Sequence, residues 1–175
     1  MRLFVSIDLP GKVREKLHGW LPDRPDLRYT KQEQLHLTLL FLGECDEQKV
    51  NSIVNELKTV QFIPFEIIIE GLGAFPDRKN PRVIWAGVNK HADLLNLQHQ
   101  ISSKLGAFAD TDENRSFKPH ITLARTTERF TLKNKNQLFE PGKSMPVKVE
   151  SFALKKSILS PEGSIHKTLQ KFNSD

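Results

Sequence analysis

The sequence contains a single cysteine, Cys45, among its 175 residues, and this scarcity excludes two kinds of site. One cysteine cannot form a disulfide within the chain and cannot supply an all-cysteine metal centre. A chain without disulfides fits a reducing compartment. We therefore expect a cytoplasmic protein.

Long hydrophobic runs are also lacking. The opening segment MRLFVSIDLPGKV is interrupted by Asp8, Pro10 and Gly11, so it is too short and too broken for a signal peptide. No other stretch approaches the length of a membrane span, and we expect no membrane contact. Low-complexity segments and composition shifts are lacking too, so residues 1–175 are predicted to form a single domain.

The charge balance is moderately basic. Lys and Arg number 26 and Asp and Glu 21, which gives a net charge of +5. This balance leans towards an anionic partner such as a nucleic acid or a phosphate ligand, but it does not decide the matter.

Hydrophobic periodicity predicts strands that alternate with a few amphipathic helices. The chain has a weak internal repeat, since each half contains a helix, a loop and a similar strand. We predict an α+β fold with two pseudo-symmetric lobes and mainly antiparallel sheets around a central cleft. The predicted strands cover 3–8, 35–43, 64–76, 81–88, 119–125, 147–159 and 165–172; the helices cover 12–21, 47–60 and 92–108; and 22–30 and 110–116 are loops.

The similar strands carry the strongest signal in the chain. LHLTLLFLG holds His36 and Thr38, and PHITLAR holds His120 and Thr122, 84 residues later. Residues two apart in a strand point to the same face, so each strand offers an imidazole beside a hydroxyl. A single such strand is readily explained as core packing. The matched pair favours a shared site across a cleft.

Two facing imidazoles suit phosphodiester chemistry. One neutral ring can take a proton from an attacking water while the other, protonated, gives a proton to the leaving oxygen. The hydroxyls of Thr38 and Thr122 can hold the non-bridging phosphate oxygens. A zinc site is disfavoured because neither His36 nor His120 has a second ligand at the usual spacing.

The order of several segments resembles the LigT-like branch of the two-histidine (2H) phosphoesterase superfamily, the RNA 2′,3′-cyclic phosphodiesterases. The segments that carry the resemblance are RLFVSIDLP, LHLTLLFLGE, RVIWAGV, KPHITLAR and SILSPEGSIHKTL. The resemblance implies a cleft with both motifs on its floor, no metal and no organic cofactor. It implies hydrolysis of an RNA 2′,3′-cyclic phosphate to a 2′-phosphate, with tRNA-half ligation as the reverse chemistry in some members.

By motif match, His36 and His120 would be the acid and base, in an order left open, and Thr38 and Thr122 the phosphate contacts. Arg125 closes the second motif and is a candidate substrate contact, although strict alternation puts it on the face opposite His120. Arg82 and His166 are weaker candidates. His166 stands where the family usually has a tyrosine, a departure expected to shift substrate preference.

The remaining charged, aromatic and histidine residues are expected to lie at the rim of the site, in the core or at the surface. A basic rim for an RNA end is predicted from Arg28, Lys31, Lys118 and Arg125. Phe41 and Trp85 are expected in the core rather than as base-stacking platforms. His18, His91 and His99 are expected at the surface.

Three functions stay open at this point, and a monomer is expected in each. The first is the cyclic phosphodiesterase acting on RNA ends or cyclic nucleotides. The second is an RNA-end-binding module without turnover. The third is a 2H phosphodiesterase for ADP-ribose 1″,2″-cyclic phosphate or 2′–5′ linked RNA. The loops 22–31 and 110–118 would set substrate length and carry no readable code.

Overall fold

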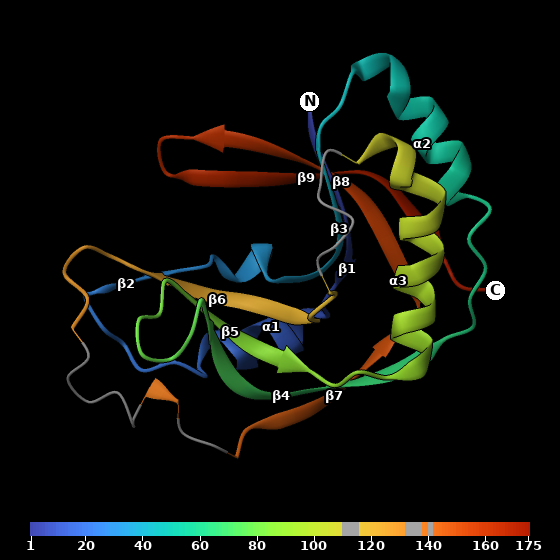
Figure 1. Ribbon diagram of the computed structural model, residues 1–175. Helices are drawn as coiled ribbons and strands as arrows, with labels where there is room; N and C mark the ends of the chain where they lie inside the picture. The colour runs from blue at the N-terminus through green and yellow to red at the C-terminus, as the bar shows by residue number, and fades with distance from the viewer. Residues whose placement is uncertain (110–115, 132–137, 140–141) are drawn as a thin grey trace.

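The computed structural model describes residues 1–109, 116–131, 138–139 and 142–175. It contains two antiparallel sheets (Figure 1). The first sheet has the strand order β3-β1-β8-β9, and the second has the order β2-β6-β5-β4-β7. The strands of the first sheet are β1 (Arg2–Asp8), β3 (His36–Glu44), β8 (Ser151–Ser160) and β9 (Gly163–Asn173). Those of the second are β2 (Leu27–Tyr29), β4 (Phe65–Phe75), β5 (Val83–Val88), β6 (His120–Thr126) and β7 (Ser144–Val149).

Helices cover one face of each sheet and leave the other to the site. In Figure 1, α2 and α3 lie beside the first sheet, and α1 lies beside the second. The Gln98 side-chain amide on α3 donates to the Leu39 carbonyl on β3 at 3.4 Å. The helices are α1 (Gly11–His18), α2 (Val50–Leu57) and α3 (Ala92–Leu105), with short 3₁₀ segments at Gln32–Gln34, Glu47–Lys49 and Gly106–Phe108. The predicted α+β fold with antiparallel sheets is thus confirmed.

The apolar face of each site strand anchors it in the core. Leu37 and Leu39 of β3 and Ile121 and Leu123 of β6 are all buried. Burial of these side chains fixes the register, because a one-residue slip would turn them to the open face. The faces that carry the histidines are therefore fixed by the leucines and isoleucine between them.

The predicted strand 147–159 is wrong as a single element. The chain changes sheet at Glu150: β7 ends before it and pairs with β4, while β8 begins after it and pairs with β1 and β9. The consecutive polar residues Glu150 and Ser151 shift the buried apolar positions from odd to even numbers, but this local break does not reveal the change of partner strand. The two lobes are consequently not the two halves of the sequence, because the last two strands, β8 and β9, join the sheet that contains β1.

The short strand β2 was not predicted either. It lies within the segment 22–30, expected as a surface connection, and its Leu27 is buried opposite Thr126. Three residues between prolines and charges give too little pattern to predict a strand. The predicted loop 110–116 lies, except for Ser116, outside the described residues.

Candidate active site

His36 and Thr38 share one face of the first sheet. His36 lies opposite Asp8 and Thr38 opposite Ser6 on β1, and directly paired residues point the same way. The intervening Leu37 is fully buried on the other face. The sequence-predicted pairing of imidazole and hydroxyl is therefore present on β3.

His120 and Thr122 form the same arrangement on the second sheet. Their partners on β5 are Gly87 and Trp85, and Ile121 between them is fully buried. Residues of β3 and β6 approach within 8 Å between Cα atoms where the two sheets meet. The structure thus brings the two motif strands together.

A β-bulge interrupts β3 directly after its motif. Thr38 pairs with Ser6 and Leu40 pairs with Val5, so Leu39 has no partner of its own on β1. The extra residue resets the alternation. Phe41, opposite Phe4, therefore lies on the same face as Thr38 and His36.

A second bulge occupies the same place in β6. Thr122 pairs with Trp85 and Ala124 pairs with Ile84, so Leu123 has no partner of its own on β5. The next residue, Arg125, pairs with Val83. Arg125 consequently lies on the face of Thr122 and is exposed. Strict alternation had placed it on the opposite face, and the bulge is the reason that this expectation is wrong.

Phe41 is not a core residue. Its side chain is 52% exposed, with its ring 5.9 Å from that of Phe4. The expectation of a buried Phe41 fails because the bulge turns it from the leucine-packed face to the open one. Phe41 and Arg125 thus occupy equivalent positions, three residues after Thr38 and Thr122 respectively.

Trp85 is partly buried and lies beside the second histidine, with ring centroids 6.0 Å apart. Gly73 on β4 makes room for it, because a Cβ there would lie 2.2 Å from the indole. Phe75 packs edge-on against His120 at 4.9 Å. The expectation of a core Trp85 therefore holds only in part: its indole also forms a wall of the site.

Both catalytic candidates have the same tautomer fixed by the backbone. His36 Nδ1 donates to the Gln34 carbonyl at 2.6 Å, and His120 Nδ1 donates to the Lys118 carbonyl at 2.7 Å. A carbonyl only accepts, so Nδ1 carries the hydrogen in each neutral ring. Each Nε2 is left with a lone pair, and that of His36 lies 3.1 Å from the Thr38 hydroxyl.

Burial keeps both rings neutral near pH 7. It lowers the pKa of His36 to about 4, against a smaller upward effect of the Gln34 carbonyl. Burial also lowers the pKa of His120, and the Lys118 carbonyl again opposes it. Desolvation disfavours the charged imidazolium in both cases. Both Nε2 atoms are therefore proton acceptors in the resting site.

The surroundings of His36 are both polar and aromatic. Phe4 packs at 5.2 Å from the His36 ring, and His166 of β9 meets that ring edge-on at 5.1 Å. Lys155 of β8 forms an ion pair with Asp8, the residue opposite His36. His166, singled out from the sequence, therefore belongs to the surroundings of His36.

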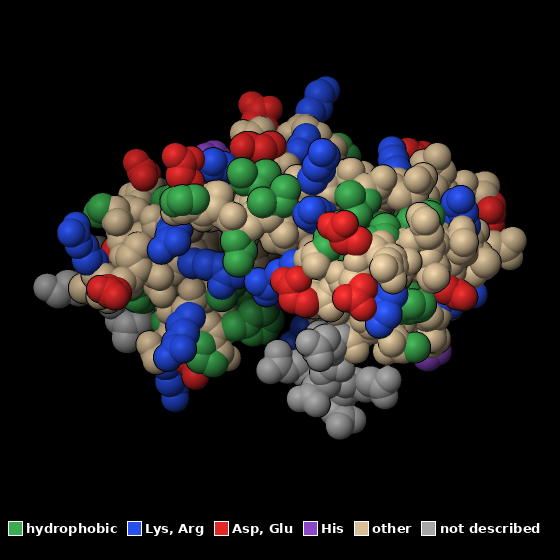
Figure 2. All heavy atoms as spheres, turned by 90° about the horizontal axis from the view of Figure 1, so that it is seen from above, with side chains coloured by type: hydrophobic (Ala, Val, Ile, Leu, Met, Phe, Trp, Pro, Cys, Tyr) green, Lys and Arg blue, Asp and Glu red, His purple; other side chains and the backbone are tan. Residues whose placement is uncertain are grey.

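The predicted basic rim is present in part. Arg28 lies directly opposite Arg125 on β2, so both point to the site face, and both are exposed. Lys31 and Lys118 are exposed as well. Lys and Arg side chains gather around a hollow on the face seen in Figure 2. Such a rim can attract a phosphate-bearing ligand.

Comparison with known proteins decides the family. Residues 7–85 match the model of the LigT like phosphoesterases. An RNA 2′,3′-cyclic phosphodiesterase of Archaeoglobus fulgidus is 37% identical over 98% of this chain and 99% of its own. The chain belongs to the LigT-like 2H phosphoesterases, the family of the RNA 2′,3′-cyclic phosphodiesterases.

Solved structures agree with this LigT-like assignment. A crystal structure of a Thermus thermophilus protein has a TM-score of 0.83 at 31% identity, covering 99% of this chain and 97% of that one. Escherichia coli LigT complexed with 3′-AMP has a TM-score of 0.83 at 27% identity, with the same coverage. The family resemblance read from the sequence is therefore confirmed.

In this LigT-like fold, the remaining candidate residue from the sequence, Arg82, is not directed to the site face. Arg82 is exposed and directly precedes β5. Because Val83 shares the face of Arg125, alternation directs Arg82 to the opposite face. Its role stays a prediction. His18 and His99 are exposed as expected, while His91 is only partly exposed and stacks on Phe65.

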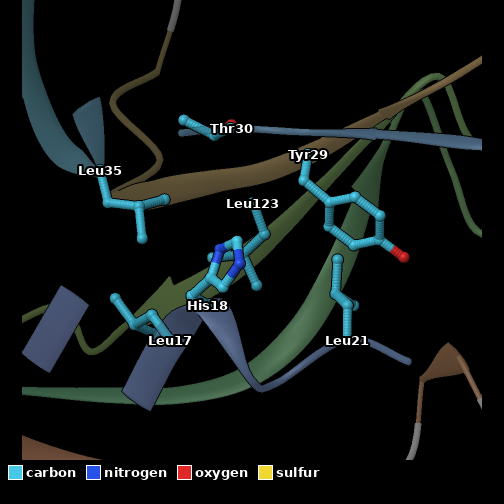
Figure 3. A pocket seen from close by; sticks show the side chains of 7 residues that line it. All are labelled: Leu17, His18, Leu21, Tyr29, Thr30, Leu35 and Leu123. Carbon is cyan, nitrogen blue, oxygen red and sulfur yellow. The ribbon is translucent and has the colours of Figure 1, made fainter. Parts of the chain in front are cut away.

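A separate crevice lies between α1 and the strands β2 and β6 (Figure 3). Its lining is mostly apolar, with Leu17, Leu21, Leu35 and Leu123 around His18 and Tyr29. Leu123 belongs to the buried side of β6, opposite the motif face. We assign this crevice to packing of α1.

Two further observations concern metals and membranes. Within the described ranges, no group of three or more His, Cys, Asp or Glu side chains is placed to hold a metal ion. Over the same ranges, no helix has the length and apolar character needed to cross a membrane.

Sequence reasoning missed Lys155 and Asp8 altogether. They are 147 residues apart in the chain, and only the antiparallel pairing of β1 with β8 brings them together. One signal was available: Lys155 directly follows the buried apolar run Phe152–Leu154, where a lysine is not expected.

Proposed function

We propose that the protein hydrolyses the 2′,3′-cyclic phosphate at an RNA end to a 2′-phosphate, with His36 and His120 as an acid-base pair. The observation that carries this proposal is the matched state of the two imidazoles. Each projects from a motif strand, and each has Nδ1 bound to the carbonyl two residues earlier, so that the lone pair is on Nε2. The Nε2 of His36 lies 3.1 Å from the Thr38 hydroxyl. The names of the relatives support the substrate class.

The reaction balances as the addition of one water molecule. The Nε2 atom of one neutral histidine takes a proton from a water molecule while the oxygen of that water bonds to phosphorus. The bond from phosphorus to the 3′ oxygen breaks, and the other histidine, protonated, gives its proton to that oxygen. The products are a 2′-phosphate and a free 3′-hydroxyl. Which histidine is the base stays open.

Protonation of the acid depends on the substrate. The resting pKa of both histidines is lowered by burial. A phosphodiester anion next to an imidazole favours its charged form, which offsets the desolvation. Binding of the substrate therefore favours protonation of the histidine that gives its proton to the leaving oxygen.

Thr38 and Thr122 are proposed to hold the non-bridging phosphate oxygens. Each hydroxyl lies on the motif face two residues from its histidine. Fixed hydroxyl donors in a site partly closed to water stabilise the charge that develops on those oxygens. No step of this scheme requires a metal ligand from the chain.

Arg125 and Phe41 are proposed to bind the RNA end on either side of the phosphate. Arg125 is exposed on the floor beside Arg28 and can pair with a phosphate oxygen. Phe41 offers an exposed ring on which a base can stack. That E. coli LigT has been crystallised with 3′-AMP supports a nucleotide as the occupant.

His166 is proposed as a further substrate contact. In the described part of the chain its Nδ1 is buried without a hydrogen-bond partner. A polar atom in this state costs free energy until a ligand or water satisfies it. Because the ring lies against His36, a turn of the His166 side chain would bring this nitrogen to a bound substrate.

The first test is hydrolysis of a nucleoside 2′,3′-cyclic phosphate in EDTA, with the product isomer identified by chromatography. Turnover to the 2′-phosphate supports the proposal, while activity abolished by EDTA contradicts it. Without turnover, a short RNA with a cyclic end and ADP-ribose 1″,2″-cyclic phosphate are tried next. Binding without hydrolysis of all three would identify an RNA-end-binding module. Ligation of tRNA halves would be assayed with the same RNA ends.

A further inference from the structure

Lys155 is a lysine in an unusual place. Its side chain is only 12% exposed, and it lies on the site face of β8, opposite Phe4 on one side and Thr168 on the other. Lysines are rarely buried to this degree without a partner. Here the ammonium pairs with the carboxylate of Asp8, which is itself 51% exposed.

Stability alone gives little reason for this ion pair. The desolvation of a buried lysine offsets much of its attraction to a carboxylate, and an apolar residue in its place is often as stable. An ion pair of this kind in an enzyme calls for a role connected with the site beside it.

The pair belongs to the shell around His36. Asp8 is the direct β-partner of His36, and Phe4, the β-partner of Lys155, packs on the His36 ring at 5.2 Å. His166 closes the shell at 5.1 Å. The charges act on the ring in opposite senses: Lys155 lowers the pKa of His36 and Asp8 raises it, as smaller effects beside burial.

Within the described part of the chain, no such pair accompanies the other histidine. Burial and the Lys118 carbonyl account for the lowered pKa of His120. The groups that face His36 are Asp8 from β1, Lys155 from β8 and His166 from β9, while β6 contributes His120 and Arg125 to the opposite side of the site. The electrostatic setting of the two imidazoles is therefore one-sided.

We infer that Lys155 is a positioning residue for the proposed reaction: held by its ion pair with Asp8 beside His36, it tunes how readily this imidazole takes up a proton. The inference rests on the proposed role of His36. Lys155 adds to the effect of burial in disfavouring the charged imidazole, and the Asp8 carboxylate opposes it. The pair makes His36 and His120 unequal, so that they can take different parts in proton transfer.

The test follows the imidazole of His36 by NMR as pH is varied, in the full-length protein. Lys155→Met removes the cation and leaves the carboxylate, so the pKa of His36 should rise by about 0.5–1 unit. Asp8→Asn removes the carboxylate and leaves the Lys155 cation in place, so the pKa of His36 should fall. The double variant should return towards the wild type, and Lys155→Arg, which keeps the charge, should titrate like the wild type.

Lys156→Met is the matched control. Lys156 adjoins Lys155 on the same strand but alternates to the other face, opposite Leu3. It removes the same charge from the protein and should leave the His36 titration unchanged. If Lys155→Met fails to fold, the direction of the Asp8→Asn shift still tests the inference.

Shifts of opposite sign in the two single variants support the inference. No shift, or shifts of the same sign, would overturn it. Because this titration is read on the free protein, it is separate from the turnover assay, in which failure of the wild type would overturn the proposed function. The acidic limb of the kcat/KM profile should move with the His36 titration in each variant.

Discussion

His36 and His120 hold the same position in two similar strands, and the difference between them lies in what surrounds each ring. Both are tied at Nδ1 to a carbonyl two residues back. Around His36 lie the His166 ring and the ion pair of Lys155 with Asp8. Around His120 lie the rings of Phe75 and Trp85.

This difference separates geometry from electrostatics. The shared features are backbone features, and they fix where each Nε2 is available. The unequal features are side chains from other strands, and they tune the charge of each ring. A near-symmetric fold can in this way give two identical residues different tasks, as acid-base catalysis requires.

The largest expected effect comes from removing either ring. His36→Ala and His120→Ala should each lower kcat by about a hundredfold or more, because each ring carries one of two required proton transfers. The measurement is release of 2′-phosphate from a cyclic substrate under single-turnover conditions. If one variant keeps near wild-type rates, the two rings do not work as a pair.

The next effect sharpens the symmetric part of the comparison. Thr38→Val and Thr122→Val keep the side-chain shape but lose the hydroxyl, and each should lower kcat/KM by about tenfold. Thr→Ser at either position should restore most of the rate. Equal losses at both positions indicate that both hydroxyls hold the phosphate. A loss confined to one position would assign the phosphate to one lobe.

Much of this site could be predicted from the sequence, because parity within a strand is a local property. His36 with Thr38 and His120 with Thr122 follow from a two-residue repeat and the leucines between them. Phe41 and Arg125 do not, because a bulge at Leu39 or Leu123 resets the parity and leaves no mark in the pattern. Each bulge is defined only against its partner strand.

Contacts between distant strands were equally out of reach. His166 could be flagged as a departure from a family motif, but its contact with His36 depends on the order β3-β1-β8-β9. That order was hidden because the shift in alternation at Glu150 and Ser151, where the chain changes sheet, does not say which strand the next segment joins. Periodicity reports which face a residue takes, not which strand lies beside it.

A moderate effect is expected where the two motifs differ in sequence. Phe41→Ala should raise KM for a nucleoside cyclic phosphate about fivefold or more through lost stacking, and should leave a base-free five-membered cyclic phosphodiester unaffected. Arg125→Ala should raise KM for both substrates, with a weaker dependence on salt. Steady-state kinetics with the two substrates checks both.

The outcomes of that experiment can contradict the assignment directly. If Phe41→Ala affects the base-free substrate as strongly as the nucleotide, its ring supports the fold of β3 and not a base. Phe41→Trp serves as the matched variant, because it keeps an aromatic surface and should retain the nucleotide KM. Leu159→Ala, at an exposed apolar residue of β8, controls for general loss of surface area.

The smallest effect concerns pH, and it tests the shared burial of the two rings. Burial lowers the pKa of His36 to about 4 and lowers that of His120 below 6.5. The reaction needs one ring neutral and the other protonated, so kcat/KM, which reports the free enzyme, should be bell-shaped with its maximum between about pH 4 and 6.5. Above pH 6.5 the protonated partner is lost, and kcat/KM should fall.

The kcat profile should lie at higher pH than this, because the phosphate anion in the complex stabilises the protonated imidazole and raises its pKa. The two profiles are measured with one cyclic nucleotide from about pH 4 to 8, with circular dichroism to exclude unfolding at the acidic end. A kcat/KM maximum above about pH 7 would mean that the rings are more solvated than the structure indicates. A flat profile would mean that proton transfer by these histidines does not limit capture of the substrate.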